Sequence, residues 1–266
     1  MDFIELGKAI ILGVLEGLTE FLPISSTGHL IIANHVLDFN DERAKVFDIF
    51  IQLGAILAIV WNYRVKVATV ARGVGRDPAA TRFVTNLFIA FLPAAVFGLA
   101  LHKTIKEHLF SPTTVALALI VGGIAILLVE KYKPAPRIHH VDDMSMLDAL
   151  KVGLAQSLAL FPGVSRSGAT IMGSLMLGLS RTAATEFSFF IAIPTMLAAT
   201  TYDLYKNIGL LKSSDVLLFA TGFVCAFASA LLVVRSLLRY IANHDFRVFA
   251  YYRLVLGPIV LLYFYW

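Results

Sequence analysis

Six stretches of this sequence are long and apolar enough to cross a lipid bilayer. A spanning helix needs about 20 predominantly apolar residues, and each stretch approaches that length. The stretches are residues 46–63, 83–101, 113–129, 186–202, 216–234 and 248–265. The hydrophobic pattern therefore predicts an all-α integral membrane protein with six spanning helices.

Two further regions, residues 3–37 and 146–180, are apolar overall but are interrupted in the middle by Pro, Gly and Ser. Each half has roughly 14 to 18 residues, which is short for a full crossing. The pattern predicts two re-entrant helical hairpins, each with a polar tip. Irregular backbone at membrane depth is tolerated only where it is buried in protein or lines a wet cavity.

A shift of 140 residues places the first broken region on the second without a gap, and the match extends into the following helix. The coinciding pairs include Phe21 and Phe161, Ser25 and Ser165, Thr27 and Ser167, Gly28 and Gly168, and Phe47 and Phe187. We therefore expect two copies of one unit, a hairpin followed by three spanning helices. The copies are residues 1–130 and 146–266, and a linker of residues 131–145 joins them.

The basic residues of the loops predict the orientation of the helices, because cytoplasmic loops carry an excess of Lys and Arg. Twelve lie on the predicted cytoplasmic side: Arg64, Lys66, Arg72, Arg76, Arg82, Lys131, Lys133, Arg137, Lys151, Arg235, Arg239 and Arg247. Seven lie on the opposite side: Lys8, Arg43, Lys45, Lys103, Lys106, Lys206 and Lys212. This alternation requires each hairpin to return to the side it entered from, so the second copy is an inverted repeat of the first. Both chain ends then face outward, and the broken helices lie near the midplane.

Composition agrees with this architecture. Of the 266 residues, 58% are hydrophobic and 15% are charged, and the mean hydropathy is +0.80. A soluble domain of this length carries more charge. The net charge of +4 reflects loop cations that set topology, so we expect membrane lipid and no nucleic acid as a partner. The single cysteine excludes an internal disulfide framework, and no nucleotide-binding motif is present.

Two carboxylates precede the first tip. Glu16 and Glu20 are four residues apart and so share one helix face. Carboxylates within apolar sequence are costly unless they are paired, protonated or bound to a cation. Their oxygens suit a hard divalent cation, Mg²⁺ or Ca²⁺. Alternatively, one of them acts as a base, or the pair lies at a solvent-facing helix start.

The first tip itself runs from Pro23 to His29. Pro23 ends the first half-helix, and Ser25 or Ser26 can cap the second. The free amides of a helix N-terminus bind anions, and Ser25 and Thr27 add hydroxyl donors. His29 can activate a serine, protonate a leaving group or attack as the nucleophile. A purely structural hydrogen bond from His29 is the plainer interpretation.

The second tip runs from Pro162 to Thr170 and contains the most informative residue, Arg166. An arginine at the tip of a re-entrant hairpin needs an anionic partner, and its planar fork matches phosphate. The hydroxyls of Ser165, Ser167 and Thr170 add donors of the kind that hold phosphate. The alternative is a structural ion pair between Arg166 and Glu16 or Glu20, which would equally bring the two tips together.

Other polar residues are weaker candidates. Asp48 and Gln52 share a face of the helix after the first tip, and Glu186 begins the corresponding helix of the second copy. Arg181 and Arg253 are expected to be anchors at the membrane surface. The loop histidines, His102, His108, His139 and His140, are expected to have no catalytic role.

The stretches Glu16 to His29 and Pro162 to Thr170 resemble the two signature motifs of the bacterial undecaprenyl-pyrophosphate phosphatases of the bacitracin-resistance type. The resemblance extends over essentially the whole chain. It implies hydrolysis of undecaprenyl pyrophosphate to undecaprenyl phosphate and inorganic phosphate, which recycles the lipid carrier for cell-wall synthesis. It also implies a divalent cation, a homodimer, and a site in the bacterial inner membrane that faces the periplasm or outside.

The same resemblance assigns roles to individual residues. Glu16 and Glu20 match metal-binding or acid–base carboxylates, and Ser26 and His29 match candidates for nucleophile and base. Arg166, Ser165 and Thr170 match phosphate-binding residues. We favour Ser26 as the nucleophile, with His29 assisted by Glu20, because a capping hydroxyl lies nearest a phosphate on that helix end.

A transporter or flippase of a phosphorylated polyprenyl lipid is the main competing hypothesis, because inverted repeats with broken helices are also a transporter architecture. The cluster of two glutamates and a histidine argues against it, since binding alone does not need these groups. A structural scaffold is disfavoured by the buried charges.

Overall fold

The computed structural model describes the backbone of residues 3–108, 111–207, 209 and 215–265, and leaves out the side chains of residues 102–108 and 265. Lys212 and the side chains of His102, Lys103, Lys106 and His108 therefore lie outside the described part. Within it, the chain forms eleven α-helices and two short 3-10 helices. Its one β-bridge joins Ile138 of the linker to Leu179. The all-helical prediction is confirmed.

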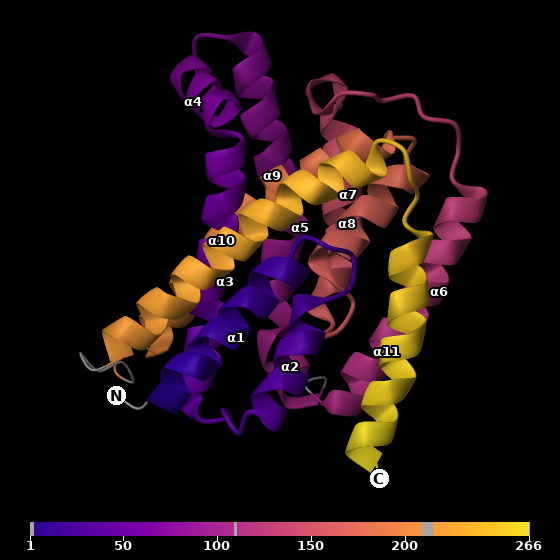
Figure 1. Ribbon diagram of the computed structural model, residues 1–266. Helices are drawn as coiled ribbons and strands as arrows, with labels where there is room; N and C mark the ends of the chain where they lie inside the picture. The colour runs from indigo at the N-terminus through magenta and orange to yellow at the C-terminus, as the bar shows by residue number, and fades with distance from the viewer. Residues whose placement is uncertain (1–2, 109–110, 208, 210–214, 266) are drawn as a thin grey trace.

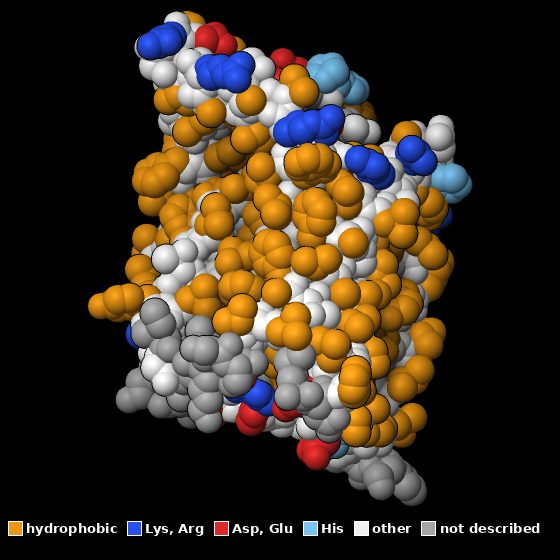
Figure 2. Space-filling model, turned by 60° about the vertical axis from the view of Figure 1, so that its left-hand side comes forward, with side chains coloured by type: hydrophobic (Ala, Val, Ile, Leu, Met, Phe, Trp, Pro, Cys, Tyr) orange, Lys and Arg blue, Asp and Glu red, His pale blue; other side chains and the backbone are white. Residues whose placement is uncertain are grey.

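All six predicted spans are helices, each long and apolar enough to cross a membrane. They are α3 (Glu42–Asn62), α5 (Pro78–His108), α6 (Pro112–Tyr132), α9 (Arg181–Asn207), α10 (Val216–Ile241) and α11 (Arg247–Tyr265). Most extend beyond the apolar stretch that predicted them, because capped polar turns continue the helix; Ser111, for example, accepts a hydrogen bond from the Thr114 amide. A broad apolar band crosses the surface, with charged side chains above and below it (Figure 2).

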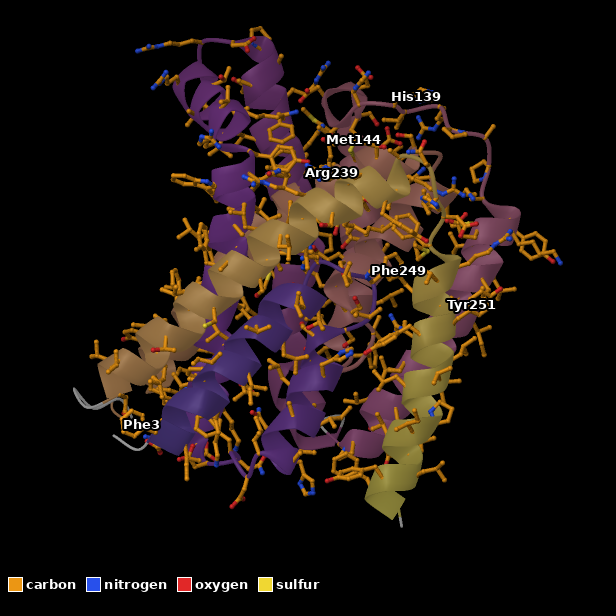
Figure 3. All side chains as sticks on the ribbon, viewed as in Figure 1. Phe3, His139, Met144, Arg239, Phe249 and Tyr251 are labelled. Carbon is orange, nitrogen blue, oxygen red and sulfur yellow. The ribbon has the colours of Figure 1, made fainter. Side chains whose placement is uncertain are left out.

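The predicted loop of residues 64–82 contains a helix that the hydrophobic pattern did not indicate, α4 (Arg64–Gly73), which has no buried residue. It projects at the upper end of the molecule together with the linker, where His139 and Met144 also lie (Figures 1 and 3). Lys66 of α4 pairs with Asp142 of the linker at 2.8 Å, and Arg82 donates to the Asp142 carbonyl at 2.7 Å. These predicted cytoplasmic loops thus lie together in space.

A second group of charges lies at the opposite end, near Phe3 (Figure 3). Arg43 pairs with Glu5 at 2.8 Å and with Asp215 at 3.1 Å. Lys8 donates to the Asp38 carbonyl at 3.0 Å. The beginning of α1 and the end of α11 are both at this lower end (Figure 1). This second group therefore lies at the end of the molecule opposite to α4 and the linker (Figures 1 and 3).

Each broken region forms a pair of helices joined by a turn. The first pair is α1 (Phe3–Thr19) and α2 (Ser26–Val36). The second is α7 (Met146–Gln156), extended by the 3-10 helix η2 (Ser157–Leu160), and α8 (Arg166–Met176). Apart from α1, the α-helical halves have only 11 residues, fewer than expected. The first tip begins at Glu20 rather than at Pro23.

The two pairs have the same local geometry at positions 140 residues apart. Ser25 and Ser165 both adopt a positive φ, 70° and 75°, which is rare for a residue with a side chain. Each caps its helix by accepting a hydrogen bond from the amide of Gly28 or Gly168, respectively. The capping prediction for Ser25 is confirmed. Both tips hold the same unusual backbone conformation, which places residue 26 or 166 at the start of its helix.

The first half of the chain packs against the second. Helix α1 lies along α10, and α7 lies along α5 (Figure 1). Small residues permit this close approach: a Cβ at Gly13 would overlap the Gly222 carbonyl of α10, and one at Gly153 would overlap Ala90 of α5. Helix α3 also packs against α9 and α10, and α6 packs against α11. The first helix of each broken pair, α1 or α7, is thus held by a spanning helix of the other half.

Candidate active site

The two tips meet inside the helical bundle. Arg166 Nη2 and Nε donate to Oε1 of Glu20 at 3.1 and 3.3 Å. Ser167 Oγ of the second tip donates to the Leu22 carbonyl of the first at 2.8 Å. The ion pair that was the alternative interpretation of Arg166 is therefore present, with Glu20 as the partner. It brings together residues 146 positions apart in sequence.

A cavity of about 230 Å³ lies between the tips. Six of the predicted site residues line it: Glu20, Ser25, Ser26, Thr27, Ser165 and Arg166. Three polar residues from neighbouring helices complete the polar lining: Gln52, Gln156 and Thr195. Sequence reasoning did not assign these three to the site, although Gln52 was noted for its position. The remaining lining is apolar, from α5, α9 and the second broken region.

Ser26 and Glu20 form the shortest polar contact at this cavity. The Ser26 hydroxyl donates to Oε2 of Glu20 at 2.5 Å, and both residues are buried. Glu20 thus accepts from the serine through one oxygen and from Arg166 through the other. A hydroxyl hydrogen-bonded to a carboxylate is the arrangement of a nucleophile and its base. The strained Ser25 turn places Ser26 at this point, since Ser26 is the first residue of α2.

The guanidinium of Arg166 is held on two sides. Besides Glu20, it donates through Nη1 to the carbonyl of Ser188 at 2.7 Å and to its hydroxyl at 3.3 Å. The Phe21 ring lies 6.0 Å away. Arg166 is the first residue of α8, so its charge lies beside a helix N-terminus that itself favours anions. The cavity wall is therefore electropositive at this point.

Glu16 lies one helical turn before Glu20 and is fully buried, and neither of its carboxylate oxygens has a hydrogen-bond partner. An unpaired buried carboxylate is costly, so Glu16 must carry a proton or face a cation. In the described part of the chain, no three His, Cys, Asp or Glu side chains form a metal-binding group. Magnesium often uses only one or two carboxylates and completes its shell with phosphate oxygens and water. Glu16 itself does not line the cavity, but Glu16 and Glu20 supply two carboxylates one helical turn apart, which suits that mode of binding.

His29 has different partners from those we expected. Its Nδ1 lies 2.7 Å from the Ser25 carbonyl, which can only accept, so Nδ1 carries the proton. In the neutral ring, Nε2 then accepts from the Tyr252 hydroxyl at 2.6 Å. The two rings are also stacked. In the structure described, His29 does not hydrogen-bond to Ser26 or Glu20; it holds the carbonyl of the strained Ser25 turn.

Two other predicted phosphate ligands also point to backbone oxygens. Ser167 donates to Leu22, as described, and the Thr170 hydroxyl donates to the Arg166 carbonyl at 2.7 Å. Both residues are fully buried and neither lines the cavity. Their hydroxyls therefore join the two tips and the first turn of α8. Phosphate binding by these two side chains remains a prediction from the motif.

The prediction that Arg253 is a surface anchor was wrong. Its side chain is 1% exposed and lies behind both tips. The signal was present in the sequence, because an arginine within an apolar span needs buried polar partners.

The other residue of that prediction, Arg181, forms a bidentate ion pair with Glu130, with contacts of 3.1 and 2.7 Å. Asp48 accepts from Asn34 at 2.5 Å, and Glu186 accepts from Tyr63 at 3.1 Å.

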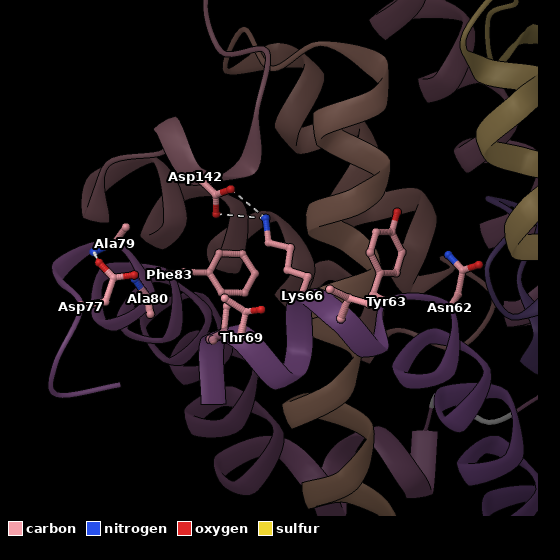
Figure 4. Close-up of a pocket in the computed structure, with 11 residues that line it drawn as sticks. Asn62, Tyr63, Lys66, Thr69, Asp77, Ala79, Ala80, Phe83 and Asp142 are labelled. Carbon is pink, nitrogen blue, oxygen red and sulfur yellow. Dashed lines mark hydrogen bonds and ion pairs between the residues drawn. The ribbon is translucent and has the colours of Figure 1, made fainter. Parts of the chain in front are cut away.

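A larger cavity, of about 520 Å³, lies away from the tips, beside α4. Figure 4 shows Lys66 between Asp142 and the ring of Phe83. No predicted site residue lines this cavity, and Lys66 already has a carboxylate partner. The smaller cavity between the tips is therefore the candidate active site.

Fold and site together define a multi-pass, all-helical membrane protein with a buried centre of carboxylate, hydroxyl and guanidinium groups. Residues 9–259 match the family model described as bacitracin resistance protein BacA, and the chain belongs to that family. The resemblance deduced from the two motifs is thereby confirmed.

Similar proteins cover the chain from end to end. An undecaprenyl-diphosphatase of Methylobacillus flagellatus is 60% identical, over 100% of both chains. The protein of the same name from Dechloromonas aromatica is 60% identical over 98% of this chain and 95% of its own. That from Nitrosospira multiformis is 61% identical over 98% of this chain and 96% of its own.

Proposed function

We propose that this protein is a membrane phosphatase that hydrolyses undecaprenyl diphosphate to undecaprenyl phosphate and inorganic phosphate. The reaction recycles the lipid carrier of cell-wall synthesis and confers resistance to bacitracin. Family membership and the names of relatives at about 60% identity support the substrate and the reaction. The single structural observation that carries the proposal is the Ser26–Glu20 hydrogen bond at a cavity that Arg166 also lines.

In the first step, the Ser26 hydroxyl oxygen attacks the terminal phosphorus while its proton passes to Oε2 of Glu20. The bond from that phosphorus to the bridging oxygen breaks, and undecaprenyl phosphate leaves with the electron pair. The product on the enzyme is phosphoserine. The 2.5 Å contact supports Glu20 as the base, because proton transfer requires hydrogen-bond distance.

In the second step, water attacks the phosphorus of the phosphoserine, and the bond from that phosphorus to the Ser26 oxygen breaks. Both protons of the water leave with the inorganic phosphate. The Ser26 oxygen recovers a proton from Glu20. The enzyme returns to its starting state, so the overall reaction consumes one water molecule per diphosphate.

Arg166 orients the phosphate and neutralises its charge. The diphosphate competes with Glu20 for the guanidinium, and the fork matches two phosphate oxygens. Loss of the Arg166 bonds frees Oε1 of Glu20, while Oε2 stays available to Ser26. The contact to Ser188 keeps the guanidinium in place during this exchange of partners.

We include a divalent cation, Mg²⁺ or Ca²⁺, which Glu16 and Glu20 would hold. When bound, it neutralises phosphate charge. The unpaired oxygens of the buried Glu16 carboxylate support this assignment.

The membrane arrangement is part of the proposal. The two broken helix pairs are re-entrant hairpins, and the halves are inverted copies, as supported by the equal tip geometry and the reciprocal packing of α1 on α10 and α7 on α5. In the bacterial inner membrane, the basic α4 end faces the cytoplasm. Thr195 and Ala199 line the cavity from the second half of α9, which supports a site open toward the periplasm. The homodimer stays a proposal from the family resemblance.

A transporter or flippase is the alternative. It requires a phosphate-binding cavity, but it has no need for a serine hydrogen-bonded to a carboxylate. The Ser26–Glu20 pair therefore favours hydrolysis over transport without cleavage.

Phosphate release tests the proposal. Purified protein in detergent, given undecaprenyl diphosphate and Mg²⁺ or Ca²⁺, is expected to release inorganic phosphate, and a chelator is expected to reduce the rate at least tenfold, roughly the loss typical when one metal-binding interaction fails. Intact lipid after incubation with folded protein would contradict the enzyme assignment. An unchanged rate with chelator would remove the metal from the mechanism while leaving hydrolysis intact.

Substitutions of His29 distinguish an orienting role from direct proton transfer. Asn can place an amide N–H where His29 Nδ1 donates to Ser25, but it has no counterpart of Nε2. If His29 holds the Ser25 turn, His29→Asn should retain activity within about tenfold, whereas His29→Ala should lose about a hundredfold, the typical loss when catalytic groups are misplaced. Equal inactivation of both variants, at wild-type thermal stability, would instead assign proton transfer to Nε2.

A further inference from the structure

Arg253 of α11 is a buried cation whose polar partners are all backbone carbonyls. Its five N–H groups make five hydrogen bonds, which is the full capacity of a guanidinium. The acceptors are the carbonyls of Leu119 at 3.2 Å, Pro23 at 3.2 Å, Val164 at 3.1 Å, Ala118 at 2.9 Å and Gly163 at 3.0 Å. No carboxylate forms an ion pair with Arg253 in the described residues.

The five carbonyls come from three places that are distant in sequence. Pro23 belongs to the first tip, and Gly163 and Val164 belong to the second. Ala118 and Leu119 belong to α6, on which α11 packs. One guanidinium group thus connects both tips to a pair of spanning helices. Pro162 and Gly163 line the cavity, whereas Arg253 does not. The guanidinium therefore lies on the side of the tips that faces away from the cavity.

The stability of the fold alone does not account for this residue. Burying a charge is costly, and apolar residues of similar volume commonly serve stability as well as buried charged groups do. An apolar side chain could not, however, fix the orientation of carbonyls in two separate turns. Those turns carry Ser26 and Arg166. The distance between these two residues decides whether the Ser26 oxygen can reach a phosphate that Arg166 holds.

We infer that Arg253 is a positioning residue of the active site, which sets the spacing and orientation of the tips that carry Ser26 and Arg166. The inference rests on the proposed phosphatase function. Two neighbours support it. Gly122 of α6 leaves the space that the guanidinium occupies, since a Cβ there would overlap it. Tyr252, the preceding residue, binds His29 of the first broken region at 2.6 Å.

Arg253→Lys tests whether the planar guanidinium, with its five N–H donors, is needed for activity. An ammonium keeps the charge but donates at most three hydrogen bonds, so it cannot hold all five carbonyls. The expected result is a fall in kcat of about a hundredfold per folded molecule, the typical loss for misplaced catalytic groups. KM for undecaprenyl diphosphate in detergent micelles should change less than about threefold, because the transition-state geometry is lost while the groups that bind the substrate remain.

A matched pair of glycine variants separates positioning from stability and does not depend on the folding of the Arg253 variant. Gly122→Ala places a methyl group against the Arg253 guanidinium, whereas Gly123→Ala places one against Leu254 and the Ala250 carbonyl. Both substitutions crowd the same contact between α6 and α11. We expect kcat to fall at least tenfold in Gly122→Ala and less than about threefold in Gly123→Ala, at comparable melting temperatures.

Equal losses in the two glycine variants, or retention of kcat within threefold in Arg253→Lys, would overturn the inference. Its failure is distinguishable from failure of the proposed function. If the wild-type protein releases no phosphate, the phosphatase proposal fails. If the wild-type protein is active and these variants are equally active, only the role of Arg253 is wrong.

Discussion

Replacing Arg166 by alanine is expected to lower kcat/KM for undecaprenyl diphosphate by at least about a thousandfold, the loss typical when a preorganised charged donor to a transferring phosphoryl group is removed. The guanidinium is the cation that the protein itself presents at the cavity, and it is held by Glu20 and Ser188. Its removal takes away the two parallel hydrogen bonds that the guanidinium can donate to phosphate. It also leaves the buried Glu20 carboxylate without its ion pair. Phosphate release by purified, folded protein measures the effect.

Arg166→Lys separates charge from geometry. Lysine keeps the positive charge but lacks the planar fork, so we expect an intermediate loss of about a hundredfold. Arg181→Lys is the matched control, because Arg181 also forms a bidentate ion pair with a buried glutamate, Glu130, but does not line the cavity. It should retain activity within about threefold, as expected for a change outside the site. Turnover of Arg166→Ala within threefold of wild type would exclude the phosphate clamp.

Ser26→Ala has the second large expected effect, a loss of kcat of at least about a thousandfold, since removal of a nucleophile leaves only the contributions of binding and electrostatics. The reason is the direct contact with Glu20, which positions the serine for deprotonation. Alanine retains the start of α2, because the capping side chain belongs to Ser25. The variant should therefore fold normally, and thermal melting in detergent checks this.

Trapping the phosphoenzyme decides the identity of the nucleophile. Acid quenching of the reaction with terminally labelled diphosphate is expected to leave the label on Ser26, and Ser26→Ala should leave none. Ser229→Ala is the control, because this half-buried hydroxyl donates within α10 and lies outside the cavity lining. It should trap as much label as wild type. In a parallel quench with neutral detergent, a label that maps to His29 and is lost in acid would transfer the nucleophilic role to the histidine.

The spanning helices could be predicted because the signal is local. About 20 consecutive apolar residues suffice to indicate a crossing, whatever packs against them. The helix α4 could not be predicted in this way, since it has only ten residues, buries none of them and carries the cations Arg64, Lys66 and Arg72. The capped starts of α2 and α8 were also local, because a serine hydroxyl three residues before a glycine amide forms the cap within one turn.

The residues of the candidate site could be predicted from the sequence, but their contacts could be predicted only in part. Sequence reasoning placed the two tips together and named Arg166 and Glu20, but it could not choose between a phosphate clamp and an ion pair. The structure contains the ion pair, which is compatible with a clamp that exchanges partners. For His29, the expected contact to Ser26 gave way to Tyr252, which lies 223 residues away in sequence.

The amino-acid sequence by itself determined the six spans, the two broken regions, their 140-residue correspondence and the residue types at the tips. In the second copy Arg166 stands where the first has Ser26, and Ala169 stands where it has His29. These features depend on composition and on spacing within a few turns. The sequence therefore shows, without any knowledge of contacts, that the two tips carry different functional groups.

Only the tertiary structure decided which groups face one another. The Glu20–Arg166 ion pair, the Tyr252 partner of His29 and the position of Arg253 depend on helices that meet from distant parts of the chain. Such contacts arise from packing over more than a hundred residues, and no local pattern encodes the resulting directions of the side chains. Arg253 illustrates the physical reason: an arginine within an apolar span needs polar partners, but only the packing supplies the five carbonyls from two distant turns and α6.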